Sequence, residues 1–156
     1  MSTDSAPAGV SGLEDHLGYW LRFVSNHVSH AFARKVEARG VTVSEWVLLR
    51  QMVAQPQAAA GALAQGIGMS KGAISKLVDR LEAKGLLTRA AVAGDRRAQQ
   101  LALTRAGRAL VPALARLADA NDAEFFGHLA PRRRDELARA MQEIVRIHQL
   151  KAVPVD

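Results

Sequence analysis

Apolar residues recur at intervals of three and four positions over most of this chain, which is the spacing that places them on one face of a helix. The first series predicts a single long helix from Leu13 to about Gly40, because a glycine is a natural C-terminal stop. Its apolar positions are Leu17, Trp20, Leu21, Val24, Val28 and Phe32. Residues 1–12 lack this periodicity and are rich in Ser, Ala, Gly and Pro, so we expect a disordered tail there.

The next stretch predicts two short helices and a turn. Thr42 and Glu45 have capping-box spacing, in which each side chain satisfies the other residue's backbone amide, and the helix that they open ends at Pro56. An alanine-rich segment over residues 58–66 predicts a second, shorter helix, which a tight connection follows. This order is typical of a helix-turn-helix unit.

The third helix of this unit is predicted to begin after Ser70, a favourable N-cap residue, and to end at Gly85. Its apolar face has i, i+3, i+4, i+7 spacing at Ile74, Leu77, Val78 and Leu81. The opposite face carries small, hydroxyl and basic side chains, which let a helix lie deep in a major groove while its cations reach phosphates or guanine edges. The residues predicted to contact DNA from this helix are Ser70, Lys71, Gly72, Ser75, Lys76 and Arg80.

Two short strands after this helix predict a wing. Residues 86–89 and 99–103 have the pattern of a β-hairpin, and the loop between them contains Gly-Asp-Arg-Arg at 94–97. A guanidinium at the tip of such a hairpin is suited to a minor groove, where width and negative potential are the features recognised.

The C-terminal third predicts two more amphipathic helices. Thr104 can cap a helix that runs to Phe126, and Pro131 suits the first turn of a last helix. A winged helix is too small to cover the apolar faces of these helices and of the N-terminal one, so we expect them to pair with a second copy of the chain. The predicted fold is therefore mostly α with a small β-wing (α+β), divided into an N-terminal dimerisation helix at 13–40, a winged helix-turn-helix domain at 42–104 and C-terminal dimerisation helices at 105–150.

The net charge of the chain is +6, and one segment accounts for all of it. Residues 66–108 contain nine basic and three acidic residues, an excess equal to that of the whole chain. A local excess of this kind is expected where a surface meets a polyanion, although a basic segment alone is more often a solvated face. With the helix-turn-helix and wing patterns beside it, the predicted partner is double-stranded DNA, bound by a homodimer at a pseudo-palindromic operator.

The composition excludes several other classes of protein. The sequence has no cysteine, which excludes disulfides and thiolate zinc sites. No stretch reaches the roughly 18 consecutive apolar residues that a transmembrane helix needs, so we expect a cytoplasmic protein without a membrane partner. We recognise no Ser, His and acid arrangement, and the basic segment has no paired carboxylates, so we predict neither an enzyme nor a cofactor.

Three histidines near the N-terminus are the candidates for a metal site. His27 and His30 lie three residues apart on the first predicted helix, and His16 is near them in sequence. Spacing is the only indication, since there is no cysteine and no obvious carboxylate on the same face. We therefore favour helix-surface or interface positions for these histidines and predict no metal.

Three short motifs are the most specific features of the chain. They are Val-Asp-Arg-Leu-Glu at 78–82, Asp95 two residues before Arg97, and Leu-Ala-Leu-Thr-Arg-Ala-Gly at 101–107. In this order they resemble the winged-helix regulators of the MarR type, and the resemblance spans nearly the whole chain. It implies a homodimeric transcription regulator, often a repressor, whose DNA affinity falls when a small aromatic or carboxylate-bearing ligand binds between the dimer helices and the winged helix. It also implies that Arg97 enters the minor groove, held by Asp95, whereas we expect Arg96 to contact phosphate.

Aromatic residues suggest where such a ligand would bind. The chain has seven of them, and five fall within the first 46 positions. The residues that we expect to line a cleft between the dimer helices and the winged helix are Tyr19, Trp20, Phe23, His27, Trp46 and Arg50. Arg50 is suited to pair with a carboxylate. The alternative is that Trp20, Phe23 and Trp46 simply belong to the core.

The sequence is compatible with two classes of function. The first is a ligand-responsive regulator that binds a specific operator. The alternative is an architectural or interaction protein on the same scaffold, without operator specificity or an effector. Competition between a genomic pseudo-palindrome and shuffled duplex at physiological salt separates the two classes.

Overall fold

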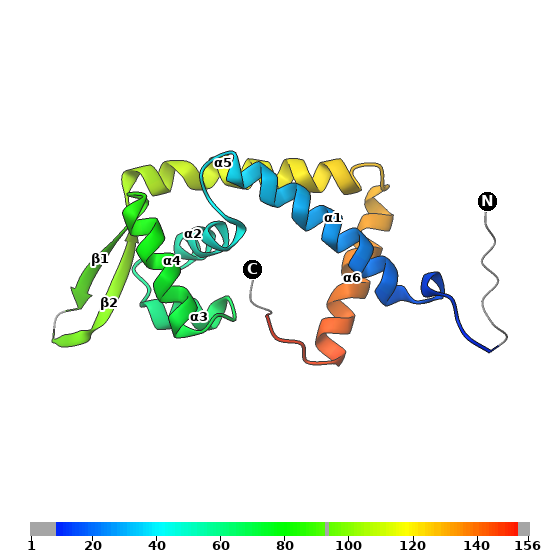
Figure 1. Cartoon of the computed structure of the whole chain (residues 1–156), viewed down its shortest axis with the longest axis horizontal. Coiled ribbons are helices and arrows are strands. Elements are labelled where there is room, and N and C mark those ends of the chain that lie inside the picture. Colours follow the sequence, from blue (N-terminus) through cyan, green and yellow to red (C-terminus); the bar gives the residue numbers. More distant parts are fainter. Residues whose placement is uncertain (1–8, 93, 153–156) are drawn as a thin grey trace.

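Within residues 9–92 and 94–152, which the computed structural model describes, the chain forms six α-helices and a two-stranded antiparallel sheet (Figure 1). The side chains of residues 95–98 lie outside this description. The elements in chain order are the 3-10 turn η1 (Leu13–Asp15), α1 (Leu17–Glu37), α2 (Val43–Ala54), α3 (Ala60–Gly66), α4 (Lys71–Ala83), β1 (Leu87–Val92), β2 (Asp95–Leu103), α5 (Arg105–Phe126) and α6 (Pro131–Ile147). The predicted class, mostly α with a small β-wing, is confirmed.

The N-terminal helix is shorter than predicted. The chain is extended at His16 (φ −100°, ψ 126°), which separates η1 from α1, so the single helix expected over 13–40 is wrong in its first turn. Local side-chain bonds explain the break, because Asp15 Oδ2 accepts from the Gly12 amide at 2.8 Å and His16 Nδ1 lies 3.0 Å from the Gly12 carbonyl oxygen. Such bonds offer the backbone an alternative to the helix. At its other end α1 stops before Gly40, as predicted.

The elements from α2 to β2 form the head of the molecule, which we define as residues 42–104. Leucine side chains dominate its core, and those that are fully buried include Leu48, Leu49, Leu63, Leu81, Leu87 and Leu101. The apolar face predicted for α4 lies in this core, with exposed fractions of 3% or less at Ile74, Leu77, Val78 and Leu81. The burial of this face turns the opposite face of α4 toward solvent.

Both helix caps predicted for the head are present. Thr42 Oγ1 accepts from the Glu45 amide at 3.2 Å, and Glu45 Oε2 accepts from the Thr42 amide at 3.1 Å, which is a complete capping box. At the start of α4, Ser70 Oγ accepts from the Ala73 amide at 3.1 Å. Local sequence therefore fixes where α2 and α4 begin.

The wing has longer strands than predicted. β1 pairs with β2 from Leu87 opposite Leu103 outward, with an irregularity between Ala91 and Val92. Gly94 has a φ of +84°, which lets the chain reverse so tightly that β2 begins at the next residue. The backbone of residues 95–97 therefore lies on a strand, and the loop expected there is wrong.

The exit from the wing is fixed to the end of α4. Thr104 Oγ1 accepts from the Gly107 amide at 3.1 Å, as predicted for a cap, and donates to the Gly85 carbonyl oxygen at 2.6 Å. A Cβ atom at Gly107 would lie 2.1 Å from the Leu86 carbonyl oxygen, so glycine is required at this close approach. The motif at 101–107 thus sets the angle at which α5 leaves the wing.

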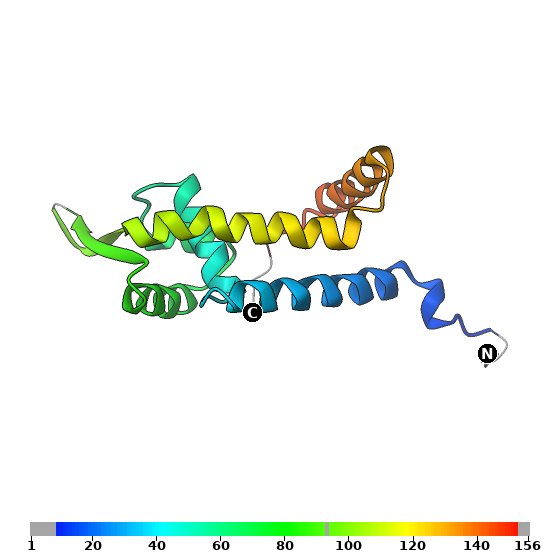
Figure 2. The same cartoon turned by 90° about the horizontal axis from the view of Figure 1, so that it is seen from above.

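The arm of the molecule, which we define as α1, α5 and α6, extends away from the head. Helices α1 and α5 lie side by side, and α6 projects from the far end of α5 (Figures 1 and 2). Buried Asn121 joins the first two helices, because its Nδ2 donates to the Val28 carbonyl oxygen at 3.1 Å and its Oδ1 accepts from Lys35 Nζ at 3.0 Å. An ion pair between Arg134 and Asp122 connects α6 to α5.

Large apolar side chains remain exposed on the arm. On α1 they are Leu17, Trp20, Leu21, Phe23 and Val24, and on α6 they are Leu137, Met141, Ile144, Val145 and Ile147. Helix α6 has no buried residue. Across the described part of the chain, no helix combines the length and the apolar character needed to cross a bilayer.

Candidate nucleic-acid interface

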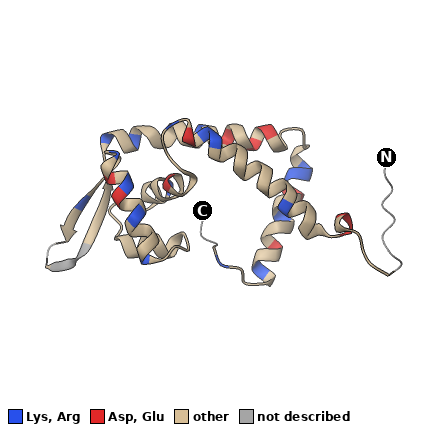
Figure 3. Ribbon diagram, in the orientation of Figure 1, with Lys and Arg blue, Asp and Glu red and all other residues tan. Residues whose placement is uncertain are grey.

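The exposed face of α4 carries the side chains predicted to contact DNA. Lys71, Gly72, Ser75, Lys76 and Arg80 are all exposed, and Figure 3 marks the basic positions along this helix. Ser70, the N-cap residue before them, is also exposed, and its hydroxyl caps the helix. The face is therefore accessible to a duplex, and the predicted contacts themselves remain predictions.

A cavity lies between the start of α3, helix α4 and the wing. Its volume is about 280 Å³, and Lys71, Ser75, Arg89 and Gln99 are among the residues that line it. A second cavity, of about 370 Å³, lies on the side of α4 that faces α2. Both cavities have a largely apolar lining, but each includes two cations, Lys71 and Arg89 in the first and Lys76 and Arg80 in the second. Cations of this kind are among the groups that hold phosphates.

The cations of α4 and of the segment from its end through β1 fall into two groups. Three are engaged with carboxylates, because Arg89 pairs with Asp79 and Glu82, and Arg80 and Lys84 both pair with Glu45. Lys71 and Lys76 have no acidic partner among the described residues.

The positive charge that is free to meet a polyanion is therefore smaller than the local excess counted from the sequence. Part of that excess balances carboxylates within the head itself. The uncompensated cations of α4 lie in its first two turns, at Lys71 and Lys76. In helix-turn-helix proteins this N-terminal part of the recognition helix is the part that meets base edges.

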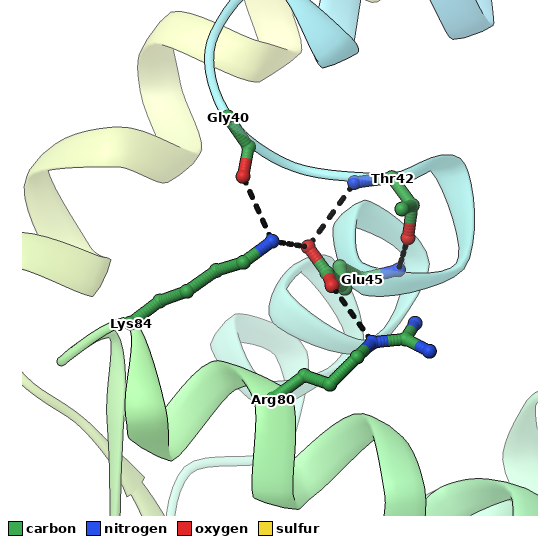
Figure 4. A network of polar contacts seen from close by, with 5 residues as sticks. All are labelled: Gly40, Thr42, Glu45, Arg80 and Lys84. Carbon is green, nitrogen blue, oxygen red and sulfur yellow. Dashed lines mark hydrogen bonds and ion pairs between the residues drawn. The ribbon is translucent and has the colours of Figure 1, made fainter.

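Glu45 is the residue of this interface that sequence reasoning missed. Its carboxylate, 1% exposed, accepts from Arg80 Nε at 3.0 Å and from Lys84 Nζ at 2.7 Å (Figure 4). Lys84 Nζ also donates to the Gly40 carbonyl oxygen at 2.9 Å. The spacing from Thr42 predicts the cap correctly, but no local pattern predicts that this carboxylate is buried against α4.

The environment of Glu45 keeps its side chain charged. Burial on its own would raise the pKa of this carboxyl group, but the Lys84 hydrogen bond, the Thr42 amide, the Lys84 charge and the Arg80 hydrogen bond together outweigh it. The pKa of Glu45 is therefore below the ordinary value of 4.5. Because the folded-state pKa is lowered, the stabilisation is complete at neutral pH and is lost only as the pH falls through that lowered value.

The wing residues of the prediction lie at the start of β2. The backbone of Asp95, Arg96 and Arg97 belongs to this strand, and their side chains lie outside the described part of the structure. The ion pair between Asp95 and Arg97, the minor-groove role of Arg97 and the phosphate role of Arg96 remain predictions.

The residues predicted to line a ligand cleft form two groups. Tyr19, Trp20, Phe23 and His27 form a row on α1, with ring centroids 5.1 Å apart at both the Tyr19–Trp20 and the Phe23–His27 contacts. Trp46, by contrast, packs edge-on against Phe32.

The first group belongs to α1 near its start, whereas Trp46 contacts α1 nearer its C-terminal end. Phe23 and Phe32 are nine residues apart on one helix, which is about 13 Å at 1.5 Å per residue. Trp20 and Phe23 are half-exposed, whereas Trp46 packs against the core, so the core alternative fits only Trp46. Arg50 is exposed on α2. That these residues bind a ligand remains a prediction.

A larger cavity lies between the end of α2, strand β2 and the start of α5. Its volume is about 460 Å³, and most of its lining is apolar, including Met52, Val53, Leu103 and Pro112. Arg108 is the cation in this lining, and its Nη1 donates to the Leu103 carbonyl oxygen at 2.6 Å. An apolar cavity with one cation suits an aromatic ligand that carries a negative charge.

The histidines considered for a metal site are separated by their contacts. His16 Nδ1 lies 3.0 Å from the Gly12 carbonyl oxygen and its Nε2 3.3 Å from Ser11 Oγ, whereas His27 packs against the Phe23 ring. His30 is exposed on α1. Among the described residues, no three His, Cys, Asp or Glu side chains are grouped closely enough to hold a metal ion.

A helix-turn-helix with an exposed, partly basic recognition helix and a two-stranded wing defines a winged-helix protein of the DNA-binding class. The model of the MarR family matches residues 39–98 of this chain. A putative transcriptional regulatory protein for the hcr operon of Thauera aromatica is 30% identical over 149 residues, which cover 93% of this chain and 88% of the relative. The chain belongs to the MarR family, whose members are DNA-binding transcription regulators.

Two solved structures show the same fold with ligands bound. CouR from Rhodococcus jostii, in complex with p-coumaroyl-CoA, is 26% identical with a TM-score of 0.74, over 86% of this chain and 95% of that one. A Mycobacterium tuberculosis MarR family protein in complex with salicylic acid is also 26% identical, with a TM-score of 0.64, over 90% of this chain and 98% of that one.

Proposed function

We propose that this regulator is a cytoplasmic homodimer that represses transcription by binding a pseudo-palindromic operator. Residues 70–84 would lie in the major groove, and Arg97 would enter the minor groove. The observation that carries this proposal is the exposed face of α4, where Lys71 and Lys76 have no acidic partner among the described residues while the opposite face is buried in the core.

The exposed apolar faces of the arm support the homodimer. Five large apolar side chains on α1 and five on α6 are exposed, far more than isolated surface positions require. A second copy offers the same faces, so a two-fold axis through the arm would cover both sets at once. The two heads would then meet half-sites about one helical turn of DNA apart.

The effector that we propose is a hydroxylated aromatic acid or its thioester. The two ligand-bound relatives hold salicylic acid and p-coumaroyl-CoA, which share a hydroxylated aromatic ring. In this chain, the aromatic row on α1 and the apolar cavity beside Arg108 are the two candidate sites. The cavity lies where α5 leaves the head, and the aromatic row lies on the arm helix α1. A ligand bound at either site would change the angle between the two heads of the dimer.

The test begins with fragments of genomic DNA selected by the purified protein. We expect a selected pseudo-palindrome to bind at least about 1,000-fold more tightly than shuffled duplex at physiological salt. Salicylate and p-coumaroyl-CoA are then titrated into the complex, and release by either one supports the effector class. If the selected sequence binds no better than shuffled duplex, the regulator proposal is overturned and the architectural alternative takes its place.

A further inference from the structure

The contacts of Glu45 join three parts of the molecule at one point. Glu45 lies in the first turn of α2, Arg80 and Lys84 lie at the end of α4, and Gly40 lies in the segment that connects α1 to the head (Figure 4). Because both carboxylate oxygens are used, the side chain has one arrangement in which every partner is satisfied. A network satisfied in this way holds its members rigidly.

The contact with Arg80 uses only one edge of the guanidinium group. Nε donates to Glu45 Oε1 at 3.0 Å, the side chain is still 50% exposed, and in Figure 4 the two terminal nitrogens point away from the carboxylate. A guanidinium presents its donors in one rigid plane. Fixing Nε therefore fixes the direction in which Nη1 and Nη2 can donate.

A held arginine binds an anion at lower entropic cost than a free one. An unrestrained arginine side chain loses rotamer freedom when it forms a contact, and this loss weakens binding. Arg80 lies near the C-terminal end of α4, whereas base edges are met by the N-terminal part of a recognition helix. The anion that Arg80 is placed to meet is thus a backbone phosphate.

We propose that Glu45 is a positioning residue for DNA binding, which orients the Arg80 guanidinium toward a phosphate of the duplex. Lys84 completes the arrangement, because it holds the other carboxylate oxygen and ties it to the Gly40 carbonyl group at the base of the arm. This inference rests on the proposed function and names residues through which the head is oriented on DNA.

The charge of Glu45 alone predicts the opposite effect on DNA affinity, so the direction of the change distinguishes the two explanations. Removing a carboxylate from a DNA-binding surface reduces repulsion and should tighten binding to any duplex. If Glu45 positions Arg80, removal of its carboxylate should instead weaken DNA binding, because the Arg80 guanidinium would no longer be held in place. In Glu45→Gln the amide oxygen can still accept from the Thr42 amide, so the cap of α2 is retained.

The experiment measures operator affinity and its salt dependence by fluorescence anisotropy. We expect Glu45→Gln and Arg80→Ala each to weaken binding about tenfold, and the double variant to be weaker by about tenfold and not hundredfold, because both changes remove one interaction. Each single variant should also make the operator affinity depend less steeply on salt concentration. Glu37→Gln is the matched control: it removes the same charge nearby, at an exposed residue with no ion-pair partner among the described residues, and should bind like the wild type.

Several outcomes overturn the inference without touching the proposed function. Tighter or unchanged binding by Glu45→Gln would do so, as would a hundredfold loss in the double variant, while the wild type still selected its operator. If Glu45→Gln does not fold, as judged by circular dichroism, Arg80→Lys replaces it. Lysine keeps the charge but lacks the planar guanidinium group that Glu45 would orient. We therefore expect a loss of operator affinity close to that of Arg80→Ala, and wild-type affinity would refute the positioning role. Failure of the wild type itself to prefer its operator counts against the proposed function instead.

Discussion

The head and the arm are both built from amphipathic helices, but α4 in the head buries its apolar face within the chain and α6 in the arm buries no residue. The apolar residues of α4 are 0–3% exposed, whereas Leu137, Met141, Ile144 and Val145 on α6 are 42–48% exposed. The periodicity that predicts these faces is equally regular in both helices. An apolar stripe thus predicts that a face will be covered, and not which partner covers it.

Helix α1 belongs to both regions. Near its C-terminal end Val36 is fully buried in the core of the head, while the aromatic row nearer its start is mostly exposed. Asn121 and Lys35 fix α1 against α5 between these two parts. Helix α1 thus connects the exposed aromatic row of the arm to the buried core of the head.

The largest effect expected from this comparison follows from charging the arm. Met141→Glu with Ile144→Glu places two carboxylates on the apolar face of α6, which the proposed dimer buries. We expect sedimentation equilibrium to give a monomer. Operator affinity should fall by about 100-fold or more, because the two heads no longer bind as one linked unit.

A control on the same helix separates charge from location. Arg139→Glu changes the charge of α6 on its exposed polar side, about 200° around the helix from Leu137 at 100° per residue. This variant should remain a dimer with nearly wild-type affinity. If the double variant also remained a dimer, α6 would not be part of the interface, and the contrast between the two regions would need another explanation.

The next effect concerns the core of the head. Leu81→Ala removes a fully buried side chain and should lower the free energy of unfolding by about 3 kcal/mol, measured by urea denaturation. Leu137→Ala removes the same atoms from the arm, where they are half-exposed in the single chain. The part of its effect that comes from the dimer contact should be lost on dilution as the dimer dissociates, whereas the effect of Leu81→Ala should persist. A loss at Leu137→Ala that did not change with protein concentration would show that Leu137 is not part of the dimer interface.

Local features of this fold could be predicted from the sequence, because the residues that determine them are close together. The Thr42 and Ser70 caps, the buried face of α4 and the Thr104 cap of α5 all depend on neighbours within a few positions. The loop conformation expected at 95–97 was wrong, because the positive φ of Gly94 lets β2 begin at the next residue. Turn geometry at one residue decided the length of both strands.

The contacts that sort the cations of the head could not be predicted. Arg89 meets Asp79 across ten residues, and Arg80 meets Glu45 across thirty-five, so neither pair has a helical spacing that a sequence pattern reveals. The ligand cleft depended on long-range packing as well. Trp46 packs beside Phe32, nine residues along α1 from Phe23 and therefore about two and a half helical turns away.

The smallest effect concerns Ser70, which has two roles that substitutions can separate. Ser70→Ala removes the hydroxyl that accepts from the Ala73 amide and should cost about 1 kcal/mol of stability. Ser70→Asp caps a helix as well as serine does, and its charge suits the N-terminus of α4, so thermal unfolding should match the wild type. The same charge would repel a phosphate, so operator affinity should fall if Ser70 meets DNA. Equal affinity for the wild type and Ser70→Asp would remove Ser70 from the predicted interface and leave it as a cap alone.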